Sequence, residues 1–230
     1  MVPRIESSLS KLNTAVRAPT IGGPVSENAQ VQKKSIGEII PEMVDPAKYP
    51  QLAALLTQYG VINRIRRKLM TLSGKKGQVV LAKNTIGAAD NKGIVYIGVD
   101  FLQDHQNDAA TLAGVMAHEW GHLCSNLLKY GHFDNLTWDE LFEIRRDEEA
   151  SADAFAGRHL PLMGYSVEPI INFLLRGKDK LGSHKYYNPN MRAEIIRRAA
   201  QSTLERQNFA QRLFKSSIYS NPYTSVLFVA

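Results

Sequence analysis

The segment Ala-His-Glu-Trp-Gly-His-Leu at residues 117–123 constrains this chain more than any other part of its sequence. Residues four positions apart lie on one face of an α-helix, so His118 and His122 can direct neutral imidazole nitrogens at a single metal ion. Glu119 projects to the neighbouring side of that face, where it can act as a general base on a water molecule at the metal. The segment therefore supplies two predicted metal ligands and a predicted catalytic base.

The residues on either side place these charges inside an apolar helix. Residues 111–117 and 123–124 are uncharged and mostly apolar. A buried carboxylate beside two histidines costs free energy unless a cation offsets its charge. We therefore expect one Zn²⁺ ion per chain, bound by a helix predicted over residues 108–129 with its N-cap at Asn107-Asp108.

Composition and charge exclude several other classes of protein. A chain of 230 residues, 44% hydrophobic and 22% charged, is typical of one soluble globular domain. It has no apolar run of the about 18 residues that span a bilayer and no signal-peptide core, so we expect a cytoplasmic protein without a membrane span. The net charge of +6 is scattered over predicted helices and turns without aromatic interleaving, so we expect no nucleic-acid partner. The one cysteine, Cys124, is expected to be a small core residue.

The periodicity of the chain predicts three regions. Residues 1–47, rich in Ser, Pro, Gly and Asn, form a flexible or draping arm, residues 48–207 form the catalytic domain, and residues 208–230 form a tail. An amphipathic helix is predicted over residues 50–72. The β-like runs 78–82 and 93–99 then predict a small antiparallel sheet, whose exposed edge can pair with an extended peptide.

A second helix, predicted over residues 138–159, carries the acidic candidates. Glu149 and Asp153 are four residues apart on one face, among small residues that allow another helix to approach closely. We expect Glu149 to be the third zinc ligand and Asp153 to accept a ring N–H from a ligand histidine. Glu148 points about 100° away and is the reserve candidate for the third ligand.

The remaining candidates lie in loops. His132 would bind metal only if the zinc helix had a glycine three and a histidine six residues past His122, and Ser125 and Leu128 stand there, so His132 is predicted to be a surface residue. Further helices are predicted over residues 167–175 and 189–206. The linker between them holds three candidates for stabilising an oxyanion, His184, Tyr186 and Tyr187.

Residues 111–123 together with residues 149–156 resemble the M48 family of zinc metallopeptidases, whose pattern is H-E-x-x-H followed on a later helix by E-x-x-x-D. The resemblance extends over about residues 50–198 and rests on these motifs. It implies a zincin-like catalytic domain of the gluzincin type. In such a domain His118, His122 and Glu149 bind zinc, Glu119 is the base, and Asp153 supports a ligand histidine.

Two features differ from the family pattern. Family members often carry a His-Pro pair before the last helix, with the histidine near the active site, whereas this chain reads Tyr187-Asn188-Pro189. The chain also lacks the membrane spans of the best-known members, which implies a soluble relative.

The sequence thus predicts an α+β, mostly helical zinc endopeptidase that hydrolyses a peptide or protein substrate. A zinc hydrolase acting on a non-peptide amide or ester is an alternative, because the same machinery would serve it. A second alternative is a binding protein that holds zinc without turnover. Glu119 argues against it, since a purely structural zinc site needs no base.

Overall fold

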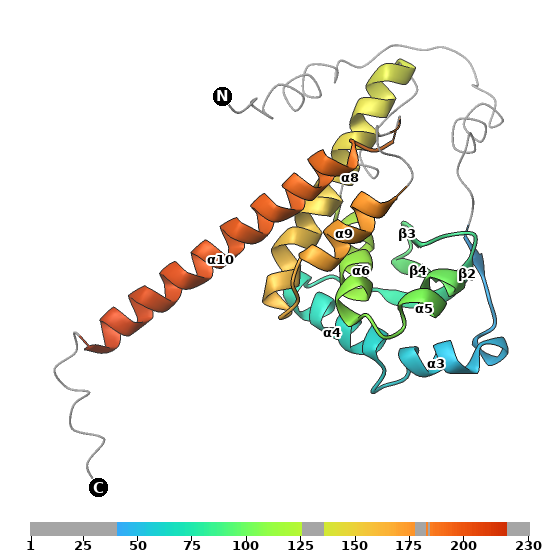
Figure 1. Cartoon of the computed structure of the whole chain (residues 1–230), viewed down its shortest axis with the longest axis horizontal. Coiled ribbons are helices and arrows are strands. Elements are labelled where there is room, and N and C mark those ends of the chain that lie inside the picture. Colours follow the sequence, from blue (N-terminus) through green and yellow to red (C-terminus); the bar gives the residue numbers. More distant parts are fainter. Residues whose placement is uncertain (1–40, 126–135, 178–182, 184, 220–230) are drawn as a thin grey trace, which may run out of the picture. The chain divides into compact units, whose positions relative to one another are not determined.

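The computed structural model describes residues 41–125, 136–177, 183 and 185–219, so the predicted surface residue His132 and most of the predicted arm lie outside the described residues. Within these ranges the fold is α+β and mostly helical, with one four-stranded sheet (Figure 1). Its elements, in chain order, are β1 (Glu42–Met43), the short 3-10 helix η1 (Pro46–Lys48), α3 (Pro50–Leu56), α4 (Val61–Ser73), β2 (Gln78–Lys83), β3 (Gly87–Ala89), β4 (Ile94–Gly98), α5 (Val99–His105), α6 (Ala109–Cys124), α8 (Trp138–Leu162), α9 (Glu168–Arg176) and α10 (Pro189–Tyr219).

The sheet is mixed, and the predicted antiparallel pairing of its two main strands is wrong. β2 and β4 are neighbours but run parallel, with Gln78 opposite Ile94 and Ala82 opposite Gly98. The segment between them contains β3, which carries the chain back antiparallel to β4, and the strand order is β1-β2-β4-β3. The sequence of β3, Gly-Ala-Ala, has weak strand propensity, which is why residues 84–92 resemble a simple turn.

The helix predicted over residues 50–72 is two helices. The chain leaves α3 at Leu56 and starts α4 at Val61, with Gly60 as the N-cap. A Cβ atom at Gly60 would collide with the carbonyl oxygen of Leu55, so the break depends on a residue without a side chain. The amphipathic interpretation is confirmed for α4, which buries Ile62, Ile65 and Leu69.

α6 runs through the core, and α4, α8, α9 and the sheet pack around it. Eleven of its residues are buried, including Leu112, Met116 and Trp120. It ends at Cys124, earlier than the predicted residue 129, and the half-buried Cys124 packs against the core as predicted. The helix that carries the histidines is therefore held on most of its sides.

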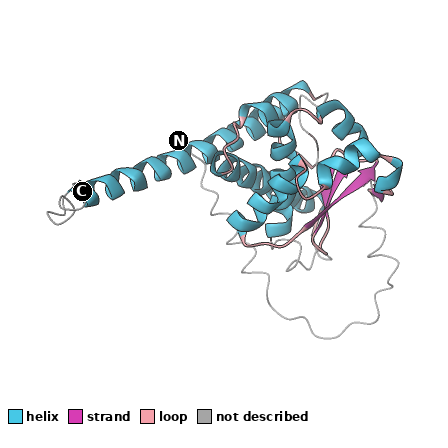
Figure 2. Cartoon of the chain, turned by 90° about the horizontal axis from the view of Figure 1, so that it is seen from below, coloured by secondary structure: helices cyan, strands magenta, loops and turns pink. Residues whose placement is uncertain are grey.

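Two helices of the C-terminal half, α8 and α10, extend past their predicted ends. α8 continues to Leu162 instead of residue 159, and α10 continues to Tyr219 instead of residue 206. Figure 2 shows the C-terminal half of α10 reaching beyond the other helices, and its side chains Phe209, Leu213 and Phe214 are exposed. Over the described ranges, none of the helices combines the length and the apolar character that crossing a bilayer requires.

The predicted N-cap of α6 is confirmed at Asp108, whose carboxylate accepts hydrogen bonds from Thr111 N at 3.0 Å and Thr111 Oγ1 at 2.7 Å. We expect Asp108→Ala to lower the free energy of unfolding by about 1 kcal/mol, because both donors lose their acceptor. Asp108→Asn keeps an acceptor and is the control. Urea unfolding followed by circular dichroism measures the difference, and equal midpoints for wild type and the Ala variant would contradict the role of the cap.

The same cap predicts a pH dependence. Burial acts to raise the pKa of Asp108, but the hydrogen bonds from Thr111 together outweigh it and lower the pKa. The contribution of the ionised cap is therefore present above the unfolded pKa of about 3.9 and is lost as the pH falls through the folded pKa. The stability difference between wild type and the Ala variant should shrink below about pH 4.

Candidate metal centre

Within residues 117–123 of α6, Trp120 lies on a different face of the helix from His118 and His122. Trp120 points to the end of α4, where its Nε1 donates a hydrogen bond to Ser73 Oγ at 3.0 Å. Gly121 lies where α6 crosses α8, and a Cβ atom there would stand 2.8 Å from Ala152 Cα. The absence of a side chain at Gly121 lets α8 approach α6 closely at the level of the histidines.

His118, His122 and Glu149 form a group that could hold a metal ion, since one ligand atom from each lies within 4.8 Å of the others. His118 Nε2 is 3.3 Å from His122 Nε2 and 3.1 Å from Glu149 Oε2. Two ligands at the usual 2.0–2.1 Å from a tetrahedral zinc ion are about 3.3 Å apart. The spacing of these atoms therefore suits a shared metal ion.

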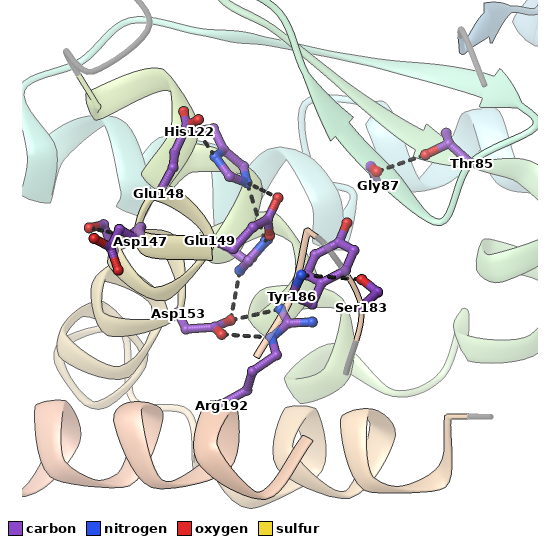
Figure 3. Close-up of polar contacts among 12 residues, drawn as sticks. Thr85, Gly87, His122, Asp147, Glu148, Glu149, Asp153, Ser183, Tyr186 and Arg192 are labelled. Atoms are coloured by element: carbon purple, nitrogen blue, oxygen red, sulfur yellow. Dashed lines mark hydrogen bonds and ion pairs between the residues drawn. The ribbon is translucent and has the colours of Figure 1, made fainter. Parts of the chain in front are cut away.

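His118 is oriented by the residue that the sequence predicted. Its Nδ1 lies 2.9 Å from Asp153 Oδ1, and Asp153 is almost fully buried. Arg192, from the first turns of α10, in turn donates to both oxygens of Asp153, from Nε at 2.7 Å and from Nη2 at 2.9 Å (Figure 3). This chain of contacts fixes the imidazole so that Nε2 faces Glu149 and His122.

The electrostatics of the group favour a positive charge between these atoms. Burial acts to lower the pKa of His118, but the carboxylates of Asp153 and Glu149 outweigh it and raise the pKa to about 10. Burial likewise acts to raise the pKa of Glu149, and its hydrogen bond to His118 lowers it overall. A metal ion that binds His118 would therefore compete with a proton for the ring.

Glu119 lies on the other side of the histidines, against β3. It is buried, and burial raises the pKa of its carboxyl while the two histidines oppose that rise. A Cβ atom at Gly87 of β3 would stand 2.8 Å from Glu119 Oε1, so only glycine leaves room for the carboxylate at that distance from the strand. Gly87 therefore allows the strand edge to border the predicted base.

Glu148, the alternative candidate for the third metal ligand, does not lie beside the Nε2 atoms of the two histidines. Its Oε1 is 3.7 Å from His122 Nδ1, whereas Glu149 Oε1 is 3.7 Å from His122 Nε2. Figure 3 shows the two carboxylates reaching different nitrogens of the same ring. Glu149, and not Glu148, is thus the carboxylate that lies close to the Nε2 atoms of both His118 and His122.

A cleft of about 860 Å³ opens beside His118. Along α6 it follows one face of the helix, and residues of α5, α8, α9 and α10, residues 86–87 and residues 183 and 186–187 also line it. The N-cap of α6 and four residues of the helix line the cleft: Asp108, Thr111, Val115, His118 and Glu119. Except for the neighbours His118 and Glu119, they are spaced three or four residues apart, so they lie on one face. The metal-ligand candidate His118 and the predicted base therefore face one shared space.

The three candidates for stabilising an oxyanion separate in the structure. Tyr186 lines the cleft, and its ring lies over the guanidinium of Arg192 at 4.8 Å. Burial and the nearby carboxylate of Glu149 raise the pKa of Tyr186, so its hydroxyl keeps its proton. Tyr187 also lines the cleft, but its hydroxyl donates to Asp147 Oδ1 at 2.9 Å, and His184 lies outside the described residues.

Arg192 and Gly87 are site residues that the sequence did not indicate. Arg192 is one of 28 basic residues, and nothing in its local pattern separates it from the others. Gly87 lies in the strand that resembles a turn. Comparison of the chain with profiles of protein families, with curated proteins and with solved structures finds no match, so the geometry of this site carries the functional argument.

Proposed function

We propose that this protein is a zinc-dependent endopeptidase with a zincin-like catalytic domain of the M48 type. The observation that supports it best is that His118, a member of the His-His-Glu group, and the buried Glu119 line one cleft that also reaches Gly87 at the strand edge. Among the described strands, β3 has a neighbour on one side only. An extended peptide can pair with such an edge, which favours a peptide over a small amide or ester as substrate.

The donor set suits zinc. Two imidazole nitrogens and one carboxylate oxygen match the three protein ligands of many catalytic zinc sites, which keep a further position open. Purely structural zinc sites use four protein ligands and commonly contain cysteine. Cys124 faces Ser73 and Lys75 rather than the histidines, so this chain lacks the cysteine ligand that a closed site near α6 would use.

In the proposed reaction, zinc held by His118, His122 and Glu149 would lower the pKa of a water molecule and polarise the scissile carbonyl. Glu119 takes a proton from the attacking water as the new C–O bond forms, and burial, which raises the pKa of its carboxyl, makes it a stronger base than an exposed glutamate. Tyr186 donates its O–H to the oxyanion. Glu119 then delivers the proton to the leaving amine as the C–N bond breaks, giving a carboxylic acid and an amine, and the acid passes its remaining proton to the amine to leave a carboxylate and an ammonium ion.

Metal removal and restoration test this function. The full chain should contain about one zinc per molecule and cleave unfolded casein, and 1,10-phenanthroline should abolish cleavage until zinc is added back. Elemental analysis and a broad fluorogenic peptide library provide the measurements. Stoichiometric zinc without cleavage of any peptide would reject the peptidase proposal and favour the zinc-holding alternative, and cleavage of small esters or amides alone would favour the non-peptide hydrolase.

A further inference from the structure

Glu148 is a buried acid that the proposed reaction does not use. Only 7% of its surface is exposed, and its Oε1 has no hydrogen-bond partner among the described residues. A buried carboxylate oxygen without a donor loses its hydration and gains nothing in return. A group that donates a hydrogen bond to this oxygen when a metal ion is bound would satisfy it.

His122 is a candidate for this donor. Oε1 of Glu148 lies 3.7 Å from Nδ1 of His122, which exceeds the usual hydrogen-bond length of about 2.7–3.2 Å. A movement of less than about 1 Å would close this gap. In the same ring, Nε2 faces His118 Nε2 at 3.3 Å and Glu149 Oε1 at 3.7 Å (Figure 3).

The two histidines differ in how firmly they are held. Nδ1 of His118 already contacts Asp153 at 2.9 Å, and Arg192 holds Asp153. Nδ1 of His122 instead faces Glu148 Oε1, at the longer distance of 3.7 Å. The pairs His118 with Asp153 and His122 with Glu148 follow the antiparallel course of α6 and α8, so one helix can orient both rings.

We propose that Glu148 is a positioning residue that accepts the Nδ1–H of His122 and so directs its Nε2 at the metal ion. The proposal rests on the metal centre of the proposed function and is independent of the reaction catalysed there. A histidine that binds metal through Nε2 carries its proton on Nδ1, and a carboxylate acceptor fixes that tautomer and strengthens the ligand. Metal binding thereby supplies the donor that Oε1 lacks.

Two substitutions of matched size separate this role from packing and from direct ligation. Glu148→Leu fills a similar volume but offers no acceptor, whereas Glu148→Gln keeps an acceptor oxygen without the charge. Glu143→Ala removes an exposed acid from the same helix and is the control. The zinc dissociation constant is measured on each full-length variant by competition with a chromophoric chelator, after circular dichroism has shown that the variant is folded.

We expect Glu148→Leu to weaken zinc binding about 10–100-fold, as is typical when a ligand histidine loses its acceptor. Glu148→Gln should keep most of the wild-type affinity. In ¹H–¹⁵N spectra of the zinc-loaded protein, the Nδ1–H signal of His122 should persist in wild type and the Gln variant and exchange away in the Leu variant. A packing role would move none of these signals.

Three results would overturn the inference. Wild-type zinc affinity in Glu148→Leu would show that the acceptor is not needed, and equal losses in the Leu and Gln variants would show that the charge or direct ligation matters instead. Failure of the wild-type chain to bind zinc would overturn the proposed function as well. The wild-type measurement therefore distinguishes failure of the metal centre from failure of this inference alone.

Discussion

Replacing Glu119 by Gln is expected to lower kcat for peptide hydrolysis by about 10²–10⁴-fold, the usual contribution of a general acid–base group. The amide has nearly the same shape as the carboxylate, so it fits the space beside Gly87, where a Cβ atom would stand 2.8 Å from Glu119 Oε1. It cannot take a proton from water at neutral pH. Zinc content and KM should change little, because Glu119 is not among the three residues that could hold the metal.

The measurement is the initial rate on a fluorogenic peptide that the wild type cleaves, with zinc determined in the same samples. Glu143→Gln makes the same chemical change at an exposed position of α8 and should leave the rate unchanged. Undiminished hydrolysis by the Glu119→Gln variant would show that the base lies elsewhere. A loss of zinc in that variant would instead mean that Glu119 takes part in holding the metal.

Replacing Glu149 by Ala is expected to weaken zinc binding by more than about 100-fold. Loss of a residue that only hydrogen-bonds to a metal ligand usually costs about 10–100-fold, and loss of a ligand itself should cost more. Its carboxylate is the only acid among the described residues that lies close to Nε2 of both His118 and His122, at 3.1 and 3.7 Å. Removing it takes away both a ligand and the negative charge that offsets the metal. Chelator competition gives the dissociation constant, and hydrolysis should fall with zinc occupancy.

Glu148→Ala provides the comparison for this experiment, because it removes the adjacent acid of the same helix. It should reduce zinc affinity less than Glu149→Ala does. The reverse order, with zinc retained in the Glu149 variant and lost in the Glu148 variant, would make Glu148 the third ligand. That outcome would require α8 to turn by about 100° relative to its position in the structure.

The grouping of His118, His122 and Glu149 that the structure shares with the prediction depends on spacing within single helices. His118 and His122 share a face because they are four residues apart, and the same rule places Glu149 and Asp153 together. The apolar surroundings of the first pair and the small residues around the second indicate that these two faces meet. In the structure α6 and α8 do pack against each other.

The parts that the sequence did not predict depend on contacts between distant segments. Arg192 reaches Asp153 across 39 residues, and no local pattern marks it. Whether Glu148 or Glu149 meets Nε2 of His122 depends on the rotation of α8 against α6, which is a property of the packing between the two helices and not of either sequence segment alone. β3 was not predicted because its small residues have weak strand propensity. Without β3, neither the mixed pairing of the sheet nor the position of Gly87 beside Glu119 could be predicted.

The crossing of α6 and α8 at Gly121 has a consequence for protein design. Both histidines and the three carboxylates of α8 that face them, Glu148, Glu149 and Asp153, come from these two helices, at positions i and i+4 on one and at i, i+1 and i+5 on the other. The carboxylates at i and i+5 lie on the Nδ1 side of the two imidazole rings, and the carboxylate at i+1 faces both Nε2 atoms. An antiparallel pair of helices with a glycine at the crossing is therefore a template on which a three-ligand metal site could be built into an unrelated bundle.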